Sequence, residues 1–152
     1  MPRSSDVMLV ALLLVTAGCT GGGAPAVPCA SKVVQKELPE WARAGFSPGV
    51  APHHVFSGRG DMVAVIFGYP LASPPRPNRG NKILWVSRLP LVPSSPLRIE
   101  ARLEGGGAPV RTKVSGGPGP SLIDLPGAGC WRLDLSWSSH TDSIDLEYVA
   151  PE

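Results

Sequence analysis

Charged side chains are scarce in this sequence of 152 residues. Asp, Glu, Lys and Arg make up 17% of it, and 14 basic residues are scattered among 12 acidic ones, which gives a net charge of +2. No run of basic residues occurs, whereas proteins that bind nucleic acids usually present a dense cluster of Lys and Arg. The charge pattern therefore predicts no polyanionic partner, and it excludes nucleic acid in particular.

Long helices are excluded as well, because residues that break helices are abundant. Gly and Pro contribute 18 residues each, which is about twice their usual combined share of roughly 12%. Hydrophobic residues still make up 43% of the chain, so there is enough apolar material for a core. The composition favours a small all-β domain with many turns, or a folded piece with flexible tails.

The apolar run at residues 7–15 is too short to cross a membrane. A spanning helix needs about 20 such residues, whereas nine is the usual length of the apolar region in a secretory signal peptide. Arg3 is the only basic side chain before the run. We therefore interpret the N-terminal segment as a targeting signal.

The four residues Thr16-Ala17-Gly18-Cys19 that follow resemble a bacterial lipobox. The resemblance implies that residues 1–18 are a lipoprotein signal peptide and that Cys19 becomes the lipidated (palmitate-bearing) N-terminus. It also implies an extracytoplasmic location at the cell membrane or outer membrane, with the outer membrane favoured because Thr20 is no evident retention signal. Ordinary secretion, with cleavage near residues 24–26, is the alternative. Residues 19–28 are then the lipidated Cys and a Gly/Ala/Pro-rich tether.

Two cysteines are left if Cys19 carries lipid. Cys29 and Cys130 form an even pair, and in an oxidising compartment such a pair predicts one disulfide. A metal pair or two free thiols are the alternatives, but neither cysteine has His or Cys neighbours at ligand spacing. The bond would join the start of the domain to a strand near its end, away from the main core face.

Hydrophobic patterning predicts an antiparallel β-sandwich of about seven strands over residues 29–152. Residues 61–68 form a continuous apolar run, which is typical of a strand buried on both faces. Other segments alternate strictly, so Trp131, Leu133, Leu135 and Trp137 are expected to share the core face. We expect a helical turn at 38–45 and loops at 47–60 and 69–80. The strands are expected at 61–68, 81–88, 97–103, 110–114, 122–125, 130–137 and 143–149.

The segment Leu125-Pro126-Gly127-Ala128-Gly129-Cys130-Trp131-Arg132-Leu133 resembles the corner between strands E and F of bacterial immunoglobulin-like domains, with Trp131 where Tyr is usual. The cysteine pair between strands B and F of antibody domains is absent. The whole plan is similar to small uncharacterised bacterial lipoproteins with a single immunoglobulin-like domain. That resemblance implies the fold but no activity.

No catalytic motif stands out, so we expect neither enzymatic activity nor a cofactor. A hydrolase needs a nucleophile on a strained turn, and Gly119-Pro120-Ser121 does not match the required Gly-x-Ser-x-Gly pattern. His53, His54 and His140 suggest copper or zinc handling as an alternative function. Because no HxH, HExxH or Met-rich cluster occurs, we expect exposed loop histidines instead.

The Pro-rich loop at 69–80 is where a partner surface is expected, because binding residues collect on loops of rigid scaffolds. Trp85, Trp131 and Trp137 follow the core pattern, which leaves Trp41 as the tryptophan most apt to be exposed. The expected surface comprises Trp41, Tyr69, Arg76, Arg79 and Lys82. The sequence thus predicts a lipid-anchored, non-enzymatic binding or accessory module with an envelope protein as partner.

Overall fold

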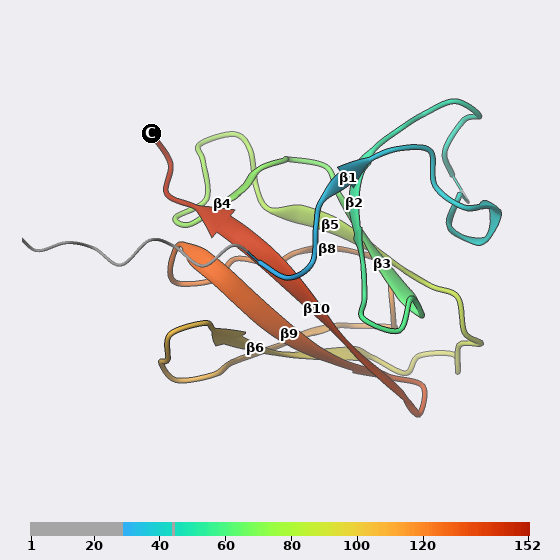
Figure 1. The fold of residues 1–152 in the computed structure, drawn as a ribbon. Coiled ribbons are helices and arrows are strands. Elements are labelled where there is room, and N and C mark those ends of the chain that lie inside the picture. Colours follow the sequence, from blue (N-terminus) through green and yellow to red (C-terminus); the bar gives the residue numbers. More distant parts are fainter. Residues whose placement is uncertain (1–28, 44) are drawn as a thin grey trace, which may run out of the picture.

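The computed structural model describes residues 29–43 and 45–152, which form two five-stranded β-sheets packed face to face (Figure 1). The predicted signal peptide, Cys19 and the tether lie outside the described residues. The elements are β1 (Val34–Gln35), the 3₁₀ helix η1 (Glu40–Ala42), β2 (His53–Phe56), β3 (Met62–Ile66), β4 (Leu71–Ala72), β5 (Lys82–Ser87), β6 (Leu97–Leu103), β7 (Val110–Val114), β8 (Pro120–Leu122), β9 (Gly129–Trp137) and β10 (His140–Val149).

The first sheet, sheet A, has the strand order β1-β2-β3-β5-β8, and the second, sheet B, has the order β4-β10-β9-β6-β7. Neighbouring strands are antiparallel throughout, except that β4 runs parallel to β10. Figure 1 shows β9 and β10 side by side, running diagonally across the molecule, with β2 and β3 of sheet A to the right of them. The predicted all-β sandwich is therefore confirmed.

The core lies between the sheets and follows the predicted alternation. Trp131, Leu133, Leu135 and Trp137 on β9 are all buried, and so is Trp85 on β5. On β10, Ile144, Leu146 and Tyr148 are buried as expected. Side chains that alternate along each strand thus fill the interior from both sheets.

Three segments differ from the expected pattern, and the described residues contain ten strands instead of about seven. The predicted loop 47–60 contains β2, which pairs with β3, so His53 and His54 are strand residues. The predicted loop 69–80 contains β4, where the side-chain amide of Asn81 bonds both the backbone N–H and the carbonyl of Ala72. The predicted strand 122–125 is instead β8, which begins at Pro120 on a sheet edge, where a missing N–H is tolerated.

Residues 36–43 and 45–50, which we call the strap, cover the outer face of sheet A. Leu38 and Ala42 of the strap are buried against Val63 and Val65 of β3. Arg43 fixes the turn, because its guanidinium donates two hydrogen bonds to the carbonyl of Leu38. All five residues of β3 are consequently buried, as the apolar run predicted.

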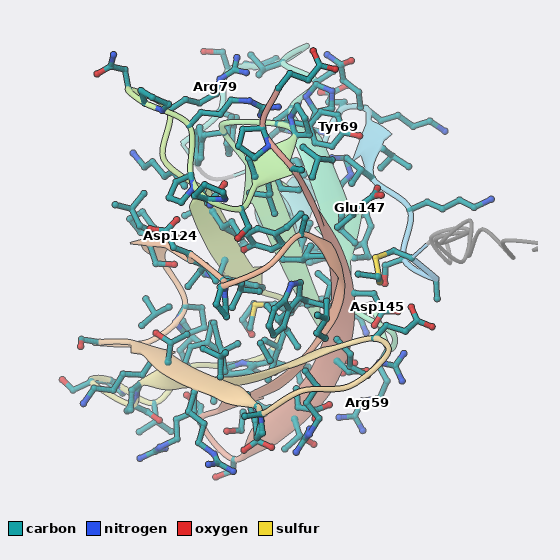
Figure 2. All side chains as sticks on the ribbon, turned by 90° about the vertical axis from the view of Figure 1, so that its left-hand side faces the viewer. Arg59, Tyr69, Arg79, Asp124, Asp145 and Glu147 are labelled. Carbon is teal, nitrogen blue, oxygen red and sulfur yellow. A yellow bond between two sulfur atoms is a disulfide. The ribbon has the colours of Figure 1, made fainter. Side chains whose placement is uncertain are left out.

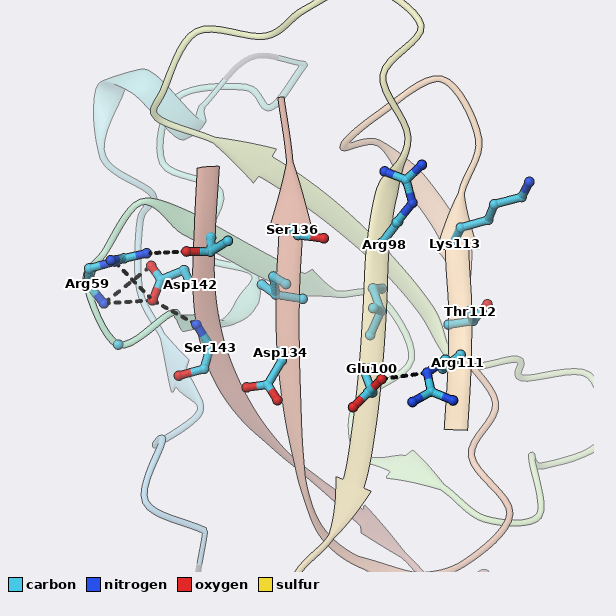
Figure 3. Close-up of a pocket in the computed structure, with 14 residues that line it drawn as sticks. Arg59, Arg98, Glu100, Arg111, Thr112, Lys113, Asp134, Ser136, Asp142 and Ser143 are labelled. Atoms are coloured by element: carbon cyan, nitrogen blue, oxygen red, sulfur yellow. Dashed lines mark hydrogen bonds and ion pairs between the residues drawn. The ribbon is translucent and has the colours of Figure 1, made fainter. Parts of the chain in front are cut away.

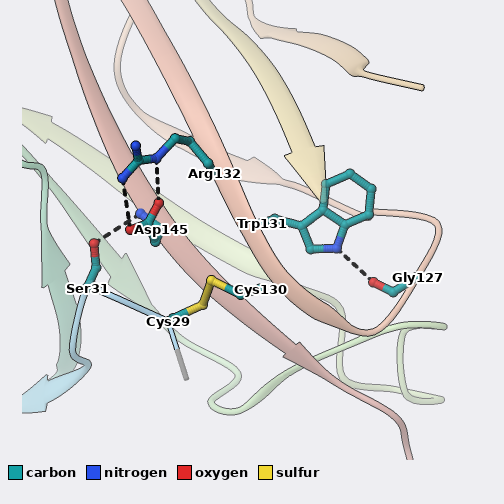
Figure 4. The surroundings of a disulfide bond; sticks show 7 residues. All are labelled: Cys29, Ser31, Gly127, Cys130, Trp131, Arg132 and Asp145. Atoms are coloured by element: carbon teal, nitrogen blue, oxygen red, sulfur yellow. Dashed lines mark hydrogen bonds and ion pairs between the residues drawn. A yellow bond between two sulfur atoms is a disulfide. The ribbon is translucent and has the colours of Figure 1, made fainter. Parts of the chain in front are cut away.

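The disulfide between Cys29 and Cys130 is present, and the two Cα atoms are 5.4 Å apart (Figure 4). Cys130 is only half-buried while the adjacent Trp131 is buried, so the bond lies off the core face as predicted. Ser31, two residues after Cys29, also contacts the side of β10 that faces away from β9. Its hydroxyl accepts a hydrogen bond from the backbone N–H of Asp145. The N-terminal segment therefore covers part of a sheet edge that would otherwise be unpaired.

Candidate functional site

All three phenylalanines of the chain lie around the strap on the outer face of sheet A. Phe67 and Phe56 are 52% and 36% exposed, and Phe46 is half-buried. Phe46 stacks on Phe67 with ring centroids 6.2 Å apart, and Trp41 lies 6.2 Å from Phe56. Together with the exposed Tyr69, these residues form what we call the aromatic surface (Trp41, Phe46, Phe56, Phe67 and Tyr69).

Three residues of the predicted partner surface lie at the aromatic surface, namely Trp41, Tyr69 and Lys82. Tyr69 is 40% exposed and stacks on His53, with ring centroids 4.3 Å apart. The ammonium group of Lys82 lies 5.2 Å from the ring centroid of Phe67, which is a cation–π distance. Trp41, which is itself part of the strap, is half-buried, so it belongs to this surface but does not project from it.

The two predicted arginines lie on the neighbouring Pro-rich loop. The guanidinium of Arg76 donates to the carbonyl of Pro70, and Arg76 pairs with Arg79 through an isolated β-bridge. Figure 2 shows Tyr69 and Arg79 at one end of the molecule and Arg59 toward the other. The phenylalanines could not be assigned to a surface from the sequence. An aromatic residue at the end of a strand is normally expected in the core, and only the structure shows that the strap covers part of this face and leaves the rings partly exposed.

A groove of about 1170 Å³ crosses the outer face of sheet B, on the opposite side of the sandwich (Figure 3). Most of the residues that line it are polar or charged, and they come from β6, β7, β9, β10 and the loop between β2 and β3. Leu135 and Ile99 contribute to its floor but are buried toward the core. Sequence reasoning did not find this groove, because its residues come from five separate segments.

Charged side chains on this face form rows across the strands. In one row, Glu100 on β6 lies opposite Arg111 on β7 and opposite Asp134 on β9. Arg102 forms ion pairs with both Glu100 and Asp134, and the Nε atom of Arg111 is 2.5 Å from Glu100. These carboxylates are therefore neutralised by arginines on the same face.

A buried carboxylate closes one end of the groove. The side chain of Asp142 is 3% exposed and accepts hydrogen bonds from the Ser57 hydroxyl at 2.6 Å and from the backbone N–H groups of Arg59, Asp61 and Ser143. Burial opposes its ionisation, but these hydrogen bonds outweigh burial and hold the pKa of Asp142 below its ordinary value. Asp142 thus joins the β2–β3 turn of one sheet to β10 of the other.

The histidines of the metal-handling alternative are divided between the two sheets. His53 and His54 lie on β2, so the expected exposed loop position is wrong for both: His53 is half-buried, and His54 is buried, with its Nδ1 atom donating to the carbonyl of Pro52. His140 begins β10 in sheet B, and its Nε2 atom donates to the carbonyl of Pro90. Within residues 29–43 and 45–152, no group of three or more His, Cys, Asp or Glu side chains is arranged to hold a metal ion.

No protein-family model matches the chain, and no curated protein and no solved structure is significantly similar to it. Among the described residues, no helix is both long and apolar enough to span a membrane.

Proposed function

We propose that this chain is a lipid-anchored, extracytoplasmic and non-enzymatic binding module, and that a protein of the cell envelope binds its aromatic surface. The exposed aromatic residues on the outer face of sheet A carry the proposal. Aromatic side chains are enriched at protein–protein interfaces, where they supply much contact area at little entropic cost. Phe56, Phe67 and Tyr69 are each partly exposed, and Phe56 and Phe67 contact the strap through Trp41 and Phe46.

Connectivity supports an immunoglobulin-like topology for the domain. The chain crosses from sheet A to sheet B between β5 and β6, returns between β7 and β8, and crosses again between β8 and β9. Such crossings are typical of Greek-key sandwiches. The indole N–H of Trp131 donates to the carbonyl of Gly127 at 2.8 Å, four residues upstream, as the corner aromatic of these domains does (Figure 4).

Photo-crosslinking in intact cell envelopes tests the partner surface. A photoreactive phenylalanine analogue at Tyr69 is expected to give a discrete adduct with one envelope protein. Phe67→Ser should lower the yield of that adduct at least fivefold, because it removes the neighbouring exposed ring. Leu91→Ser is the matched control, since Leu91 is similarly exposed at 50% but lies on a different loop. Equal yields from both variants, or no adduct, would contradict the proposed surface.

The lipid anchor has a separate test. Cys19→Ser is expected to move the protein from the membrane fraction to the soluble extracytoplasmic fraction, because the acyl chains that bury CH₂ groups in the bilayer are lost. Intact-mass measurement of the membrane-bound wild type should show the added acyl mass. If the variant stays with the membrane fraction after a salt wash, the anchor is not at Cys19.

A further inference from the structure

One row of the groove on sheet B holds two positive charges side by side. Arg98 on β6 lies directly opposite Lys113 on β7, and the row continues through Ser136 on β9 to Thr141 on β10. Like charges directly opposite each other across two strands are destabilising. Figure 3 shows both long side chains extending toward the same end of the groove, with Ser136 beside Arg98.

Neither of these two cations has an ion-pair partner among the described residues, unlike the other arginines that line the groove. Arg111 pairs with Glu100, and Arg59 lies near Asp61 and Asp142. A like-charge pair with no counter-ion attracts a ligand anion, because the anion relieves the repulsion that the fold leaves in place.

We propose that the groove is a binding site for an oligosaccharide that bears a single carboxylate, which is held between Arg98 and Lys113. The proposal concerns the sheet opposite to the aromatic surface and is independent of the proposed protein partner. The planar guanidinium of Arg98 suits bidentate binding of a carboxylate, and the ammonium of Lys113 adds a point charge.

The net charge of the groove indicates whether its ligand carries one carboxylate or a more highly charged group. Four cationic and three anionic side chains line the groove, so its net charge is about one positive unit. A monoanion balances that charge, whereas a dianionic phosphate or a polyanion would exceed it and leave an excess of negative charge in the groove. This agrees with the absence of a basic run in the sequence.

The lining of the groove favours a sugar over an acidic peptide. The hydroxyls of Ser136 and Thr141 follow the cationic pair along the row and can bond to sugar hydroxyls. The strands beneath, β6 and β9, are paired on both sides, so a peptide cannot add to them as a further strand. None of the residues that line the groove is aromatic, so it lacks the ring contacts that commonly anchor peptides.

Calorimetry with matched probes tests this site in the full-length protein in detergent. A trisaccharide ending in glucuronic acid is expected to bind at least tenfold more tightly than the same trisaccharide ending in glucose. The double variant Arg98→Gln/Lys113→Gln should lose at least tenfold in affinity. It should melt no lower than wild type, because a repulsive pair is removed. The control Lys32→Gln/Lys36→Gln changes the net charge equally, away from the groove, and should bind within twofold of wild type.

Several results would overturn the assignment. These are no measurable binding of the acidic trisaccharide, equal binding of the neutral one, or equal loss in both double variants. Glucose 6-phosphate or a tetrapeptide with one Glu, binding more tightly than the uronate and depending on the same two residues, would assign the groove to that ligand class instead.

Discussion

Replacing both Cys29 and Cys130 by serine is expected to lower the free energy of unfolding by about 4 kcal/mol, because the bond closes a loop of roughly 100 residues in the unfolded chain. The two cysteines are 101 positions apart in sequence. For a domain of this size, the midpoint of thermal unfolding should fall by about 10–20 °C. Urea and thermal unfolding followed by circular dichroism measure both effects.

The reductant supplies an internal control for this prediction. Wild type in dithiothreitol should unfold as the double variant does without it, and the variant should not respond to the reductant. Hydrogen exchange at the Asp145 amide should accelerate in the variant, because its acceptor is the hydroxyl of Ser31, only two residues from Cys29. A wild type whose thermal midpoint ignores the reductant would show that the disulfide contributes nothing to stability.

Asp142→Asn is expected to cost about 3 kcal/mol at pH 7, since hydrogen bonds to a buried charged group contribute about 1.5–3 kcal/mol each. One carboxylate oxygen becomes an NH₂ group, which cannot accept from the Ser57 hydroxyl or the Asp61 amide. Chemical denaturation measures the loss. Asp134→Asn is the matched control, because Asp134 is half-exposed and its ion pair with Arg102 is solvated, so its cost should stay below about 1 kcal/mol.

The difference in the free energy of unfolding between wild type and Asp142→Asn should also depend on pH. The pKa of Asp142 is lowered in the folded protein, so its contribution to stability is complete above the unfolded pKa of about 3.9. The contribution is lost as pH falls from there through the folded pKa. The stability difference between wild type and Asp142→Asn should therefore narrow below about pH 4, and a constant difference down to pH 2 would contradict the role assigned to this carboxylate.

Strictly alternating segments could be predicted closely from the sequence. The bounds of β6 and β7 agree with the expected 97–103 and 110–114, because a period of two with charged residues on the other face fits only a half-buried strand. The disulfide was also predictable on the expectation that Cys19 carries lipid, since the two remaining cysteines allow a single pairing. Trp85, Trp131 and Trp137 are buried, as their positions in the predicted strands indicated.

Other features depend on contacts between distant segments. β4 is only two residues long in a Pro-rich stretch, and it forms a strand because β10 and the side chain of Asn81 pair with it. The row of Arg98 and Lys113 is fixed by the register of β6 against β7, and the two residues are well separated in sequence. Likewise, Asp142 meets Ser57 across 85 positions, a distance that no local pattern encodes.

The position of the disulfide also determines how the domain carries mechanical load. A pull on the chain before Cys29, opposed at the C-terminal end, passes through the sulfur–sulfur bond into Cys130 on β9. The polypeptide from residue 30 to 129 is bypassed and bears none of that tension. The load then enters sheet B at the open end of the β9–β10 pair, because Cys130 lies opposite Glu147 close to the end of β10, so the residue pairs separate one after another from that end.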